Sequence, residues 1–334
     1  MSTSKINRLR TGIAFSLSIL VIGFAGWLFL NRQFVLDQVS VWNYQPSASV
    51  ERLDNRVKFT DKGLFTFYAT KPVLADPGEF NGSCPRQEAG SPILGCYTSA
   101  DRIFVFNVAN EQLDGMKEVT AAHEMLHAVW YRMSASEQKR IGALLTAAYE
   151  KTANAELKER MAYYQRTEPE AITNELHSIL GTEVGNLGSE LEDYYGQYFE
   201  NRQIILDLHA KYNDVYKALY SRADSLYSQM DTLSKSIDSR SAAYDTDVTK
   251  LSQDISRFNA RANSGDFDSV SQFNAEKAVL VNRSNRLEAQ RTAIYTDIDK
   301  YNKMYEEYKT LASQIELLNN SVDSFKSLGE APTV

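Results

Sequence analysis

Apolar side chains recur at every seventh position through the last third of this 334-residue chain. Two such rows, offset by four positions, form the seam of a coiled coil. One stretch has the rows Tyr212, Leu219, Leu226, Leu233 and Tyr216, Ala223, Met230, Ile237, Tyr244, Leu251, Phe258; the next has Leu280, Leu287, Ile294, Tyr301, Tyr308, Ile315, Val322 and Met304, Leu311, Leu318, Phe325. The break at residues 263–266 predicts an antiparallel hairpin with arms of roughly 75–90 Å. Pairing with a second chain, as a homo-oligomer or with a coiled-coil partner, satisfies the same pattern.

A second constraint is the uncharged apolar run at residues 12–30. As a helix it nearly matches a hydrocarbon core of about 30 Å. Three basic residues precede it and Arg32 alone closely follows it, which favours residues 1–11 in the cytoplasm. The run exceeds the apolar core of a cleaved signal peptide and ends without a small-residue cleavage site. We therefore expect a retained signal-anchor, single-pass in the cell membrane, with the remaining chain extracytoplasmic; inverted topology is the alternative.

The two cysteines agree with an oxidising location. Cys84 and Cys96 lie twelve positions apart in a stretch rich in glycine and proline. A disulfide that closes this loop stabilises the fold by roughly 2–3 kcal/mol. Two free thiols, which the inverted topology predicts, are the alternative.

Composition excludes other classes. A net charge of -7 argues against a nucleic-acid partner. A hydrophobic content of 43% is ordinary for a folded protein.

The signals between the two helical segments are mixed. We expect a stalk at residues 31–50, a folded head at 51–190, the hairpin or coiled coil at 191–328 and a tail at 329–334. Strands are expected at 57–60 and 64–68, joined by a turn at 61–63, and at 102–108. Helices are expected at 114–133, from a capping box formed by Ser134 and Glu137, and from about 167 to Gly181. The predicted fold class is an α+β head, with a small antiparallel or mixed sheet plus helices, preceded by one transmembrane helix and followed by a long α-helical coiled coil.

The chemical signal is the sequence His123-Glu124-Met125-Leu126-His127. On a helix, the two histidines lie one turn apart on the same face and can bind one Zn²⁺. Glu124 then lies beside the open coordination position, where it can accept a proton from a bound water.

This segment resembles the zincin metallopeptidases, whose HExxH helix follows a substrate-lining edge strand and whose third zinc ligand comes later in the chain. The resemblance covers about residues 100–200. It implies that Glu124 is the general base and that a peptide pairs in extended form with the strand at 103–108. The metzincin extension is absent, because Trp130 and Met133 stand where its glycine and third histidine belong.

The third ligand is sought in residues 172–182, which resemble the Asn-Glu helix of the gluzincins. Glu175 matches the position that completes the site with the two histidines. Ile179 replaces the aspartate that this family has four residues later. Glu183 and His177 are the alternative ligands.

The resulting expectation is a membrane-anchored, extracytoplasmic zinc metalloendopeptidase that acts on a peptide or protein substrate with Zn²⁺ as its cofactor. The donor that stabilises the oxyanion is left open among Tyr163, Tyr164, Tyr194 and Tyr195. The competing hypothesis is a structural envelope protein with an inactive or zinc-stabilised head and a coiled-coil spacer.

Overall fold

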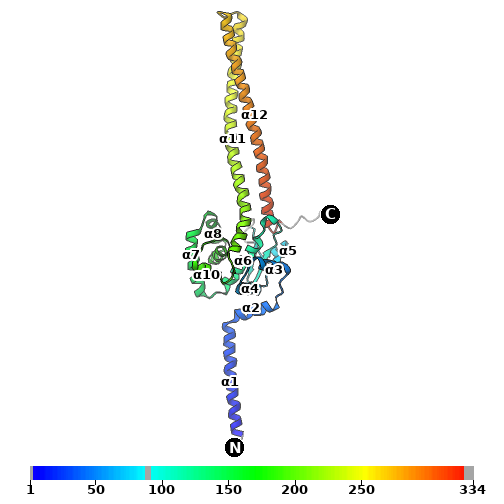
Figure 1. Ribbon diagram of the computed structural model, residues 1–334, viewed down its shortest axis with the longest axis vertical. Helices are drawn as coiled ribbons and strands as arrows, with labels where there is room; N and C mark the ends of the chain where they lie inside the picture. The colour runs from blue at the N-terminus through cyan, green and yellow to red at the C-terminus, as the bar shows by residue number, and fades with distance from the viewer. Residues whose placement is uncertain (1–2, 87–91, 327–334) are drawn as a thin grey trace, which may run out of the picture. The chain divides into compact units, whose positions relative to one another are not determined.

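The computed structural model describes residues 3–86 and 92–326. The chain separates into two compact units, the first from residues 1–215 and 318–334 and the second from 216–317. In chain order the elements are α1 (Thr3–Leu30), α2 (Arg32–Asn43), α3 (Ala48–Val57), α4 (Asp61–Ala69), β1 (Val73–Ala75), α5 (Pro77–Ser83), β2 (Gly95–Thr98), β3 (Arg102–Phe106), η1 (Glu111–Leu113), α6 (Met116–Arg132), α7 (Ala135–Thr152), α8 (Ala155–Thr167), α9 (Ile172–Glu183), α10 (Ser189–Tyr195), α11 (Gln203–Ser264) and α12 (Val270–Val322). Figure 1 shows them along the chain.

The predicted fold class is wrong. Helices make up most of the described chain, and its strands form one small sheet. The first unit is a helical body that carries this sheet, and the second is a helical hairpin. The expected α+β head behind a single transmembrane helix is not what the chain forms, for the local reasons that follow. The expected tail at 329–334 lies outside the described residues.

Neither of the two segments expected as paired strands forms the predicted hairpin. Val57 ends α3, residues 58–60 link it to α4 with Phe59 in an isolated antiparallel bridge to Phe199, and residues 64–68 lie within α4. The Thr60 side chain accepts a hydrogen bond from the Gly63 amide at 3.1 Å, which caps α4. The presumed hairpin turn is therefore the first turn of a helix. Tertiary burial of Phe67 outweighs the strand preference of these aromatic residues.

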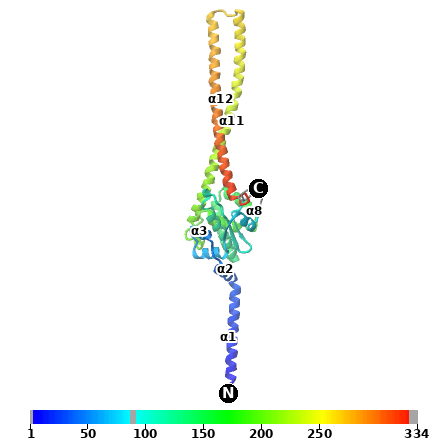
Figure 2. The same cartoon turned by 90° about the vertical axis from the view of Figure 1, so that its right-hand side faces the viewer.

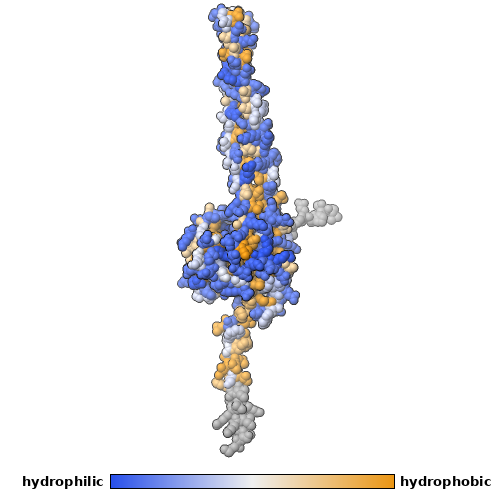
Figure 3. All heavy atoms as spheres, in the orientation of Figure 1, coloured by the Kyte–Doolittle hydropathy of each residue, from blue (hydrophilic) through white to orange (hydrophobic). Residues whose placement is uncertain are grey.

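The apolar N-terminal segment is uncovered. Side chains such as Ile22, Phe29 and Leu30 are 71%, 81% and 82% exposed, and Figure 3 shows orange surface over this part of α1. Among the residues described, no helix alone has the length and hydropathy of a membrane span. Phe15–Leu30 and Arg32–Asn43 meet that criterion only as a pair, with a bend of 79°.

The expected stalk is folded into the first unit. Its helix α2 packs against α4. The buried Asp37 of α2 accepts two hydrogen bonds from Arg132, at 2.7 and 2.9 Å. Since Arg132 ends α6, this ion pair joins α2 to the helix that carries the HExxH sequence.

The sheet has the strand order β1-β3-β2, with β1 parallel and β2 antiparallel to β3. Phe104 of β3 is paired with Val73 on one side and Cys96 on the other. The strand expected as the edge is therefore central. Its apolar run is buried on both faces, as a central strand requires. The edge next to α6 is β2.

Helices α6 and α9 pack closely in the core of the first unit. Helix α9 continues past Gly181 to Glu183. A Cβ on Gly181 would lie 2.4 Å from Leu126 and 2.7 Å from Tyr195. This glycine therefore permits close helix packing, and it does not end the helix as predicted. The capping box of Ser134 and Glu137 at the start of α7 is confirmed.

The second unit is an antiparallel hairpin within one chain, as the break in the apolar rows predicts. Figures 1 and 2 show its part of α11 and α12 lying side by side. Its seam buries side chains from the expected rows: Ala223, Leu226, Met230, Leu251 and Ile294. Ion pairs also join the arms, among them Arg222–Glu307 at 2.5 Å and Arg261–Glu276 at 2.6 Å.

Candidate metal centre

The structure brings His123, His127 and Glu175 together from two helices. Nε2 of His127 lies 3.4 Å from Oε1 of Glu175, and Nε2 of His123 lies 3.7 Å from its Oε2. The ligating atoms of the three side chains all lie within 4.8 Å of one another. Glu175 and His127 are buried, and His123 is partly exposed.

These distances fit a small metal ion. Donors about 2.1 Å from a tetrahedral zinc lie about 3.4 Å from one another. Both imidazole–carboxylate distances exceed the 2.7–3.2 Å of an ordinary N–H···O hydrogen bond. Two histidines and one carboxylate are also a donor set that zinc prefers in catalytic sites.

The electrostatics of Glu175 agree with a cation-binding role. Burial by itself raises the pKa of Glu175, but the neighbouring His127 and His123 outweigh it, so the pKa is lowered. The nearby hydroxyl of Tyr164 lowers the pKa of this carboxyl further. Glu175 is therefore held in its ionised form, which is the form that binds metal.

Glu124 lies between the two histidines in sequence and is 6% exposed. Burial raises its pKa to about 7, and the charge of Glu175 adds to the rise. The neighbouring His127 and the backbone of Tyr97 in β2 act in the opposite direction and lower this pKa. A carboxyl group with a pKa near neutrality suits a group that takes up and releases protons.

Ser178 of α9 contacts one of the candidate ligands, His127. Its Oγ lies 3.3 Å from Nδ1 of His127. In the tautomer that leaves Nε2 free to bind a metal, Nδ1 carries the proton and its N–H donates a hydrogen bond to Ser178. Ile179, at the position where the gluzincin pattern has aspartate, is 1% exposed and belongs to the apolar core. The outer partner of the histidine is therefore a serine one position earlier.

Glu183 does not belong to this cluster. It accepts hydrogen bonds from Arg160 at 2.7 and 2.6 Å, and Nε2 of His209 lies 3.3 Å from it. Burial opposes ionisation, but His209 and Arg160 lower the pKa of Glu183 to about 2. A carboxylate engaged in this way is not the third ligand.

His177 is buried away from the cluster. Its Nε2 lies 2.8 Å from the hydroxyl of Tyr194, and Tyr195 donates to its backbone carbonyl at 2.7 Å. Burial lowers the pKa of His177 well below its usual value, so the ring is neutral. Two of the four tyrosines considered as oxyanion donors thus pack around His177.

A cleft of about 600 Å³ opens over the three candidate ligands and Glu124. The other two tyrosines, Tyr163 and Tyr164, line it, and so does Glu168. Burial, together with the charge of Glu175, raises the pKa of Glu168. Strand β2 and the segment around Ser83 also line the cleft.

The edge strand β2 approaches the HExxH helix very closely at Gly95. A Cβ on this glycine would lie 2.6 Å from both Oε1 of Glu124 and Cγ2 of Thr120. Only glycine lets β2 lie directly against Glu124. Strand β2 is only four residues long, too short for a recognisable strand pattern in the sequence.

Cys84 and Cys96 are joined by a disulfide, with their Cα atoms 5.8 Å apart. Cys96 belongs to β2, and Cys84 follows α5. The bond therefore connects the edge strand to the segment around Ser83, which lines the same cleft.

Three residues of the site escaped the sequence analysis. Ser178 lies three positions after Glu175, on the same helical face, so its spacing was a usable signal. Gly95 and Tyr97 come from a separate element and carried no such signal. No family model, no curated protein and no solved structure matches this chain.

Proposed function

We propose that this protein is a zinc-dependent peptidase whose centre is formed by His123, His127, Glu175 and Glu124. The observation that carries the proposal is the pair of Nε2–carboxylate distances, 3.4 and 3.7 Å, beside a buried glutamate. A purely structural zinc site has no use for Glu124 beside its open position. The geometry of these four side chains supports the proposed function, whereas the overall fold does not.

The side chains have separate roles. His123, His127 and Glu175 would hold the metal, which would supply Lewis-acid activation of water and of the scissile carbonyl group. The Glu124 carboxylate accepts a proton from the attacking water as its oxygen bonds to the carbonyl carbon, and passes that proton to the amine nitrogen as the C–N bond breaks. Tyr163 and Tyr164 both line the cleft and are the candidate oxyanion donors.

An extended peptide is the substrate that this cleft suits. All four residues of β2 line it, and within the described sheet β2 is paired only with β3. A peptide can add to the other edge of β2 through main-chain hydrogen bonds. This geometry predicts cleavage within an extended segment of a peptide or protein.

The decisive variant is Glu124→Gln in the full chain. We expect one zinc per chain in both the wild type and the variant, and peptide hydrolysis in the wild type alone. Loss of a general base costs about 10²–10⁴-fold in rate. Zinc without hydrolysis in either protein, with unchanged function in cells, would support the rival structural spacer.

We further propose that the exposed apolar segment at residues 15–30 attaches the chain to a membrane, with the cleft on the extracytoplasmic side. The apolar side chains are uncovered in the structure, and the disulfide suits an oxidising compartment. Charged substitutions at Ile22 and Phe24 should release the protein from sedimented membranes. Alkylation of Cys84 in intact cells without prior reduction would contradict the extracytoplasmic location.

A further inference from the structure

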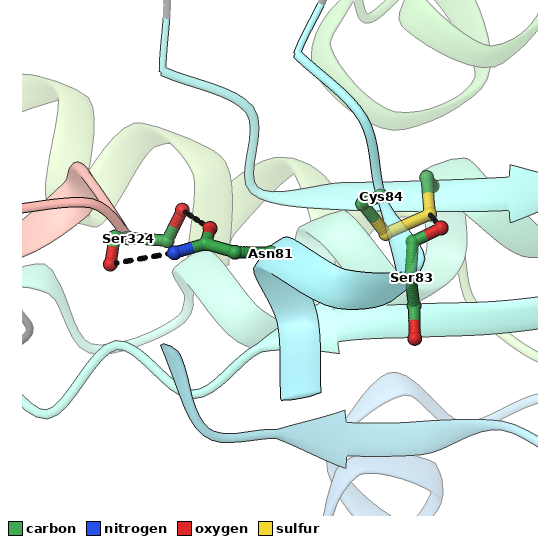
Figure 4. The surroundings of a disulfide bond; sticks show 5 residues. Asn81, Ser83, Cys84 and Ser324 are labelled. Atoms are coloured by element: carbon green, nitrogen blue, oxygen red, sulfur yellow. Dashed lines mark hydrogen bonds between the residues drawn. A yellow bond between two sulfur atoms is a disulfide. The ribbon is translucent and has the colours of Figure 1, made fainter. Parts of the chain in front are cut away.

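The chain that follows α12 is fastened to the segment that ends α5. Asn81 donates to the carbonyl of Ser324 at 3.2 Å, and the Ser324 hydroxyl donates to Asn81 at 2.5 Å (Figure 4). Arg86 pairs with Asp323 at 2.5 Å. The Arg86 guanidinium also lies 4.4 Å from the ring centre of Phe325. These contacts join residues about 240 positions apart.

The residues that make these contacts are largely shielded from solvent. Ser324 is fully buried, and the side chains of Asp323 and Arg86 are 10% and 13% exposed. Leu318 and Val322, which precede them, are also buried. A buried ion pair with hydrogen-bonded neighbours is costly to break at one partner, because the other charge is left uncompensated. The contact is therefore a specific anchor for the segment.

What it anchors is one wall of the candidate cleft. Ser83 and Pro85, which lie between the anchored residues Asn81 and Arg86, line the cleft. Cys84 lies between them, and its disulfide leads to the edge strand β2. Figure 4 shows the contact between Asn81 and Ser324 on the left and Ser83 and Cys84 on the right, with the ribbon of α5 between them. The wall is thus held to β2 by a covalent bond and to residues 323–325 by non-covalent contacts.

We propose that residues 318–326 are a strap that positions this wall for substrate, so that Arg86 and Asp323 are positioning residues. The proposal rests on the peptidase function of the cleft. Neither residue lines the cleft, and neither is among the candidate metal ligands. Loosening the strap should therefore weaken the binding of an extended peptide while the metal and Glu124 remain in place.

The test compares Asp323→Asn with the wild-type full chain. In the variant, amide hydrogen exchange in residues 77–86 should accelerate roughly tenfold or more, because a charge-assisted contact is lost. The KM for a peptide substrate should rise by a similar factor, with kcat and zinc affinity unchanged. Arg86→Lys keeps the positive charge that faces Asp323. Exchange in residues 77–86 of this variant should therefore stay closer to the wild-type rate than in Asp323→Asn.

A matched control is Glu276→Gln, which breaks the 2.6 Å pair with Arg261 within the hairpin. It should leave exchange in residues 77–86 and the KM unchanged. Should Asp323→Asn fail to fold, Phe325→Ala serves instead, because Phe325 is half exposed and its loss removes only the cover of Arg86.

The outcomes are separable. Unchanged exchange in residues 77–86 of Asp323→Asn overturns the strap, whatever the activity. Faster exchange with an unchanged KM overturns its role in substrate binding. If the wild type hydrolyses no peptide, the peptidase function fails by itself, while exchange in residues 77–86 still decides whether Asp323 holds the wall.

Discussion

The Oγ of Ser178 lies 3.3 Å from Nδ1 of His127, while Nε2 of the same ring faces Glu175. This contact holds the orientation of the ring, and in the tautomer with the proton on Nδ1 it leaves Nε2 free to bind a metal. Ser178 is itself fully buried, and its position is set by helix α9, which also carries Glu175. One candidate ligand and the group that orients another thus come from one helix.

Ser178→Ala should reduce zinc affinity by about 10-fold, because outer hydrogen-bond partners of metal-bound histidines contribute 10–100-fold. Competition with a zinc chelator at neutral pH measures this change. Thr182→Val is the control: it removes a buried hydroxyl that donates to the Ser178 carbonyl at 2.8 Å and has no hydrogen bond to either histidine. Equal affinities in the two variants would show that Ser178 does not orient His127.

Glu175→Gln should weaken zinc binding by at least about 100-fold, more than the loss of an outer partner, because it removes a charged ligand. Glu183→Gln should leave the zinc content unchanged, since Glu183 is engaged by Arg160 and His209. Zinc content after dialysis measures both. Metal retained in Glu175→Gln and lost in Glu183→Gln would reverse the assignment of the third ligand.

Gly95→Ala should lower activity while zinc is retained. The added methyl would meet Oε1 of Glu124 at 2.6 Å, so either this carboxylate or β2 must shift. A misplacement of the reacting groups by about 1 Å lowers the rate about 100-fold. Gly82→Ala is the matched control, because a Cβ there has no neighbour within 4 Å. Wild-type rates in Gly95→Ala would mean that β2 does not adjoin the reacting groups.

The buried Glu183 should make the free energy of unfolding depend on pH in the acid range. Its folded-state pKa is about 2 against an ordinary value of 4.5, so its ion pairs stabilise the fold above pH 4.5. That contribution, on the order of 3 kcal/mol, disappears as the pH falls from 4.5 toward 2. Urea unfolding with EDTA present should show a wild-type advantage over Glu183→Gln at pH 7 that shrinks at pH 3. A constant difference across this range would contradict the assignment.

Several predicted secondary-structure elements are wrong at places where the segment packs against another part of the chain. Residues 64–68 have strand-like composition, yet the Thr60 cap and burial against the core make them helical. Gly181 looks like a helix end, but its missing side chain admits Leu126 and Tyr195. In each case a contact with a distant segment outweighs a local preference.

The sequence by itself determined the features that depend on local periodicity. The spacing of His123 and His127 places both imidazoles on one helical face, and the heptad rows and their break define the two arms of the hairpin. These features follow from 3.6 residues per turn.

The tertiary structure decided which distant groups meet. It brought Glu175 to the histidines and gave Glu183 to Arg160, although both carboxylates lie on α9. It also made β2 the edge strand beside Glu124. Such choices depend on the close packing of α6, α9 and the sheet, where one methyl group more or less alters which side chains can touch.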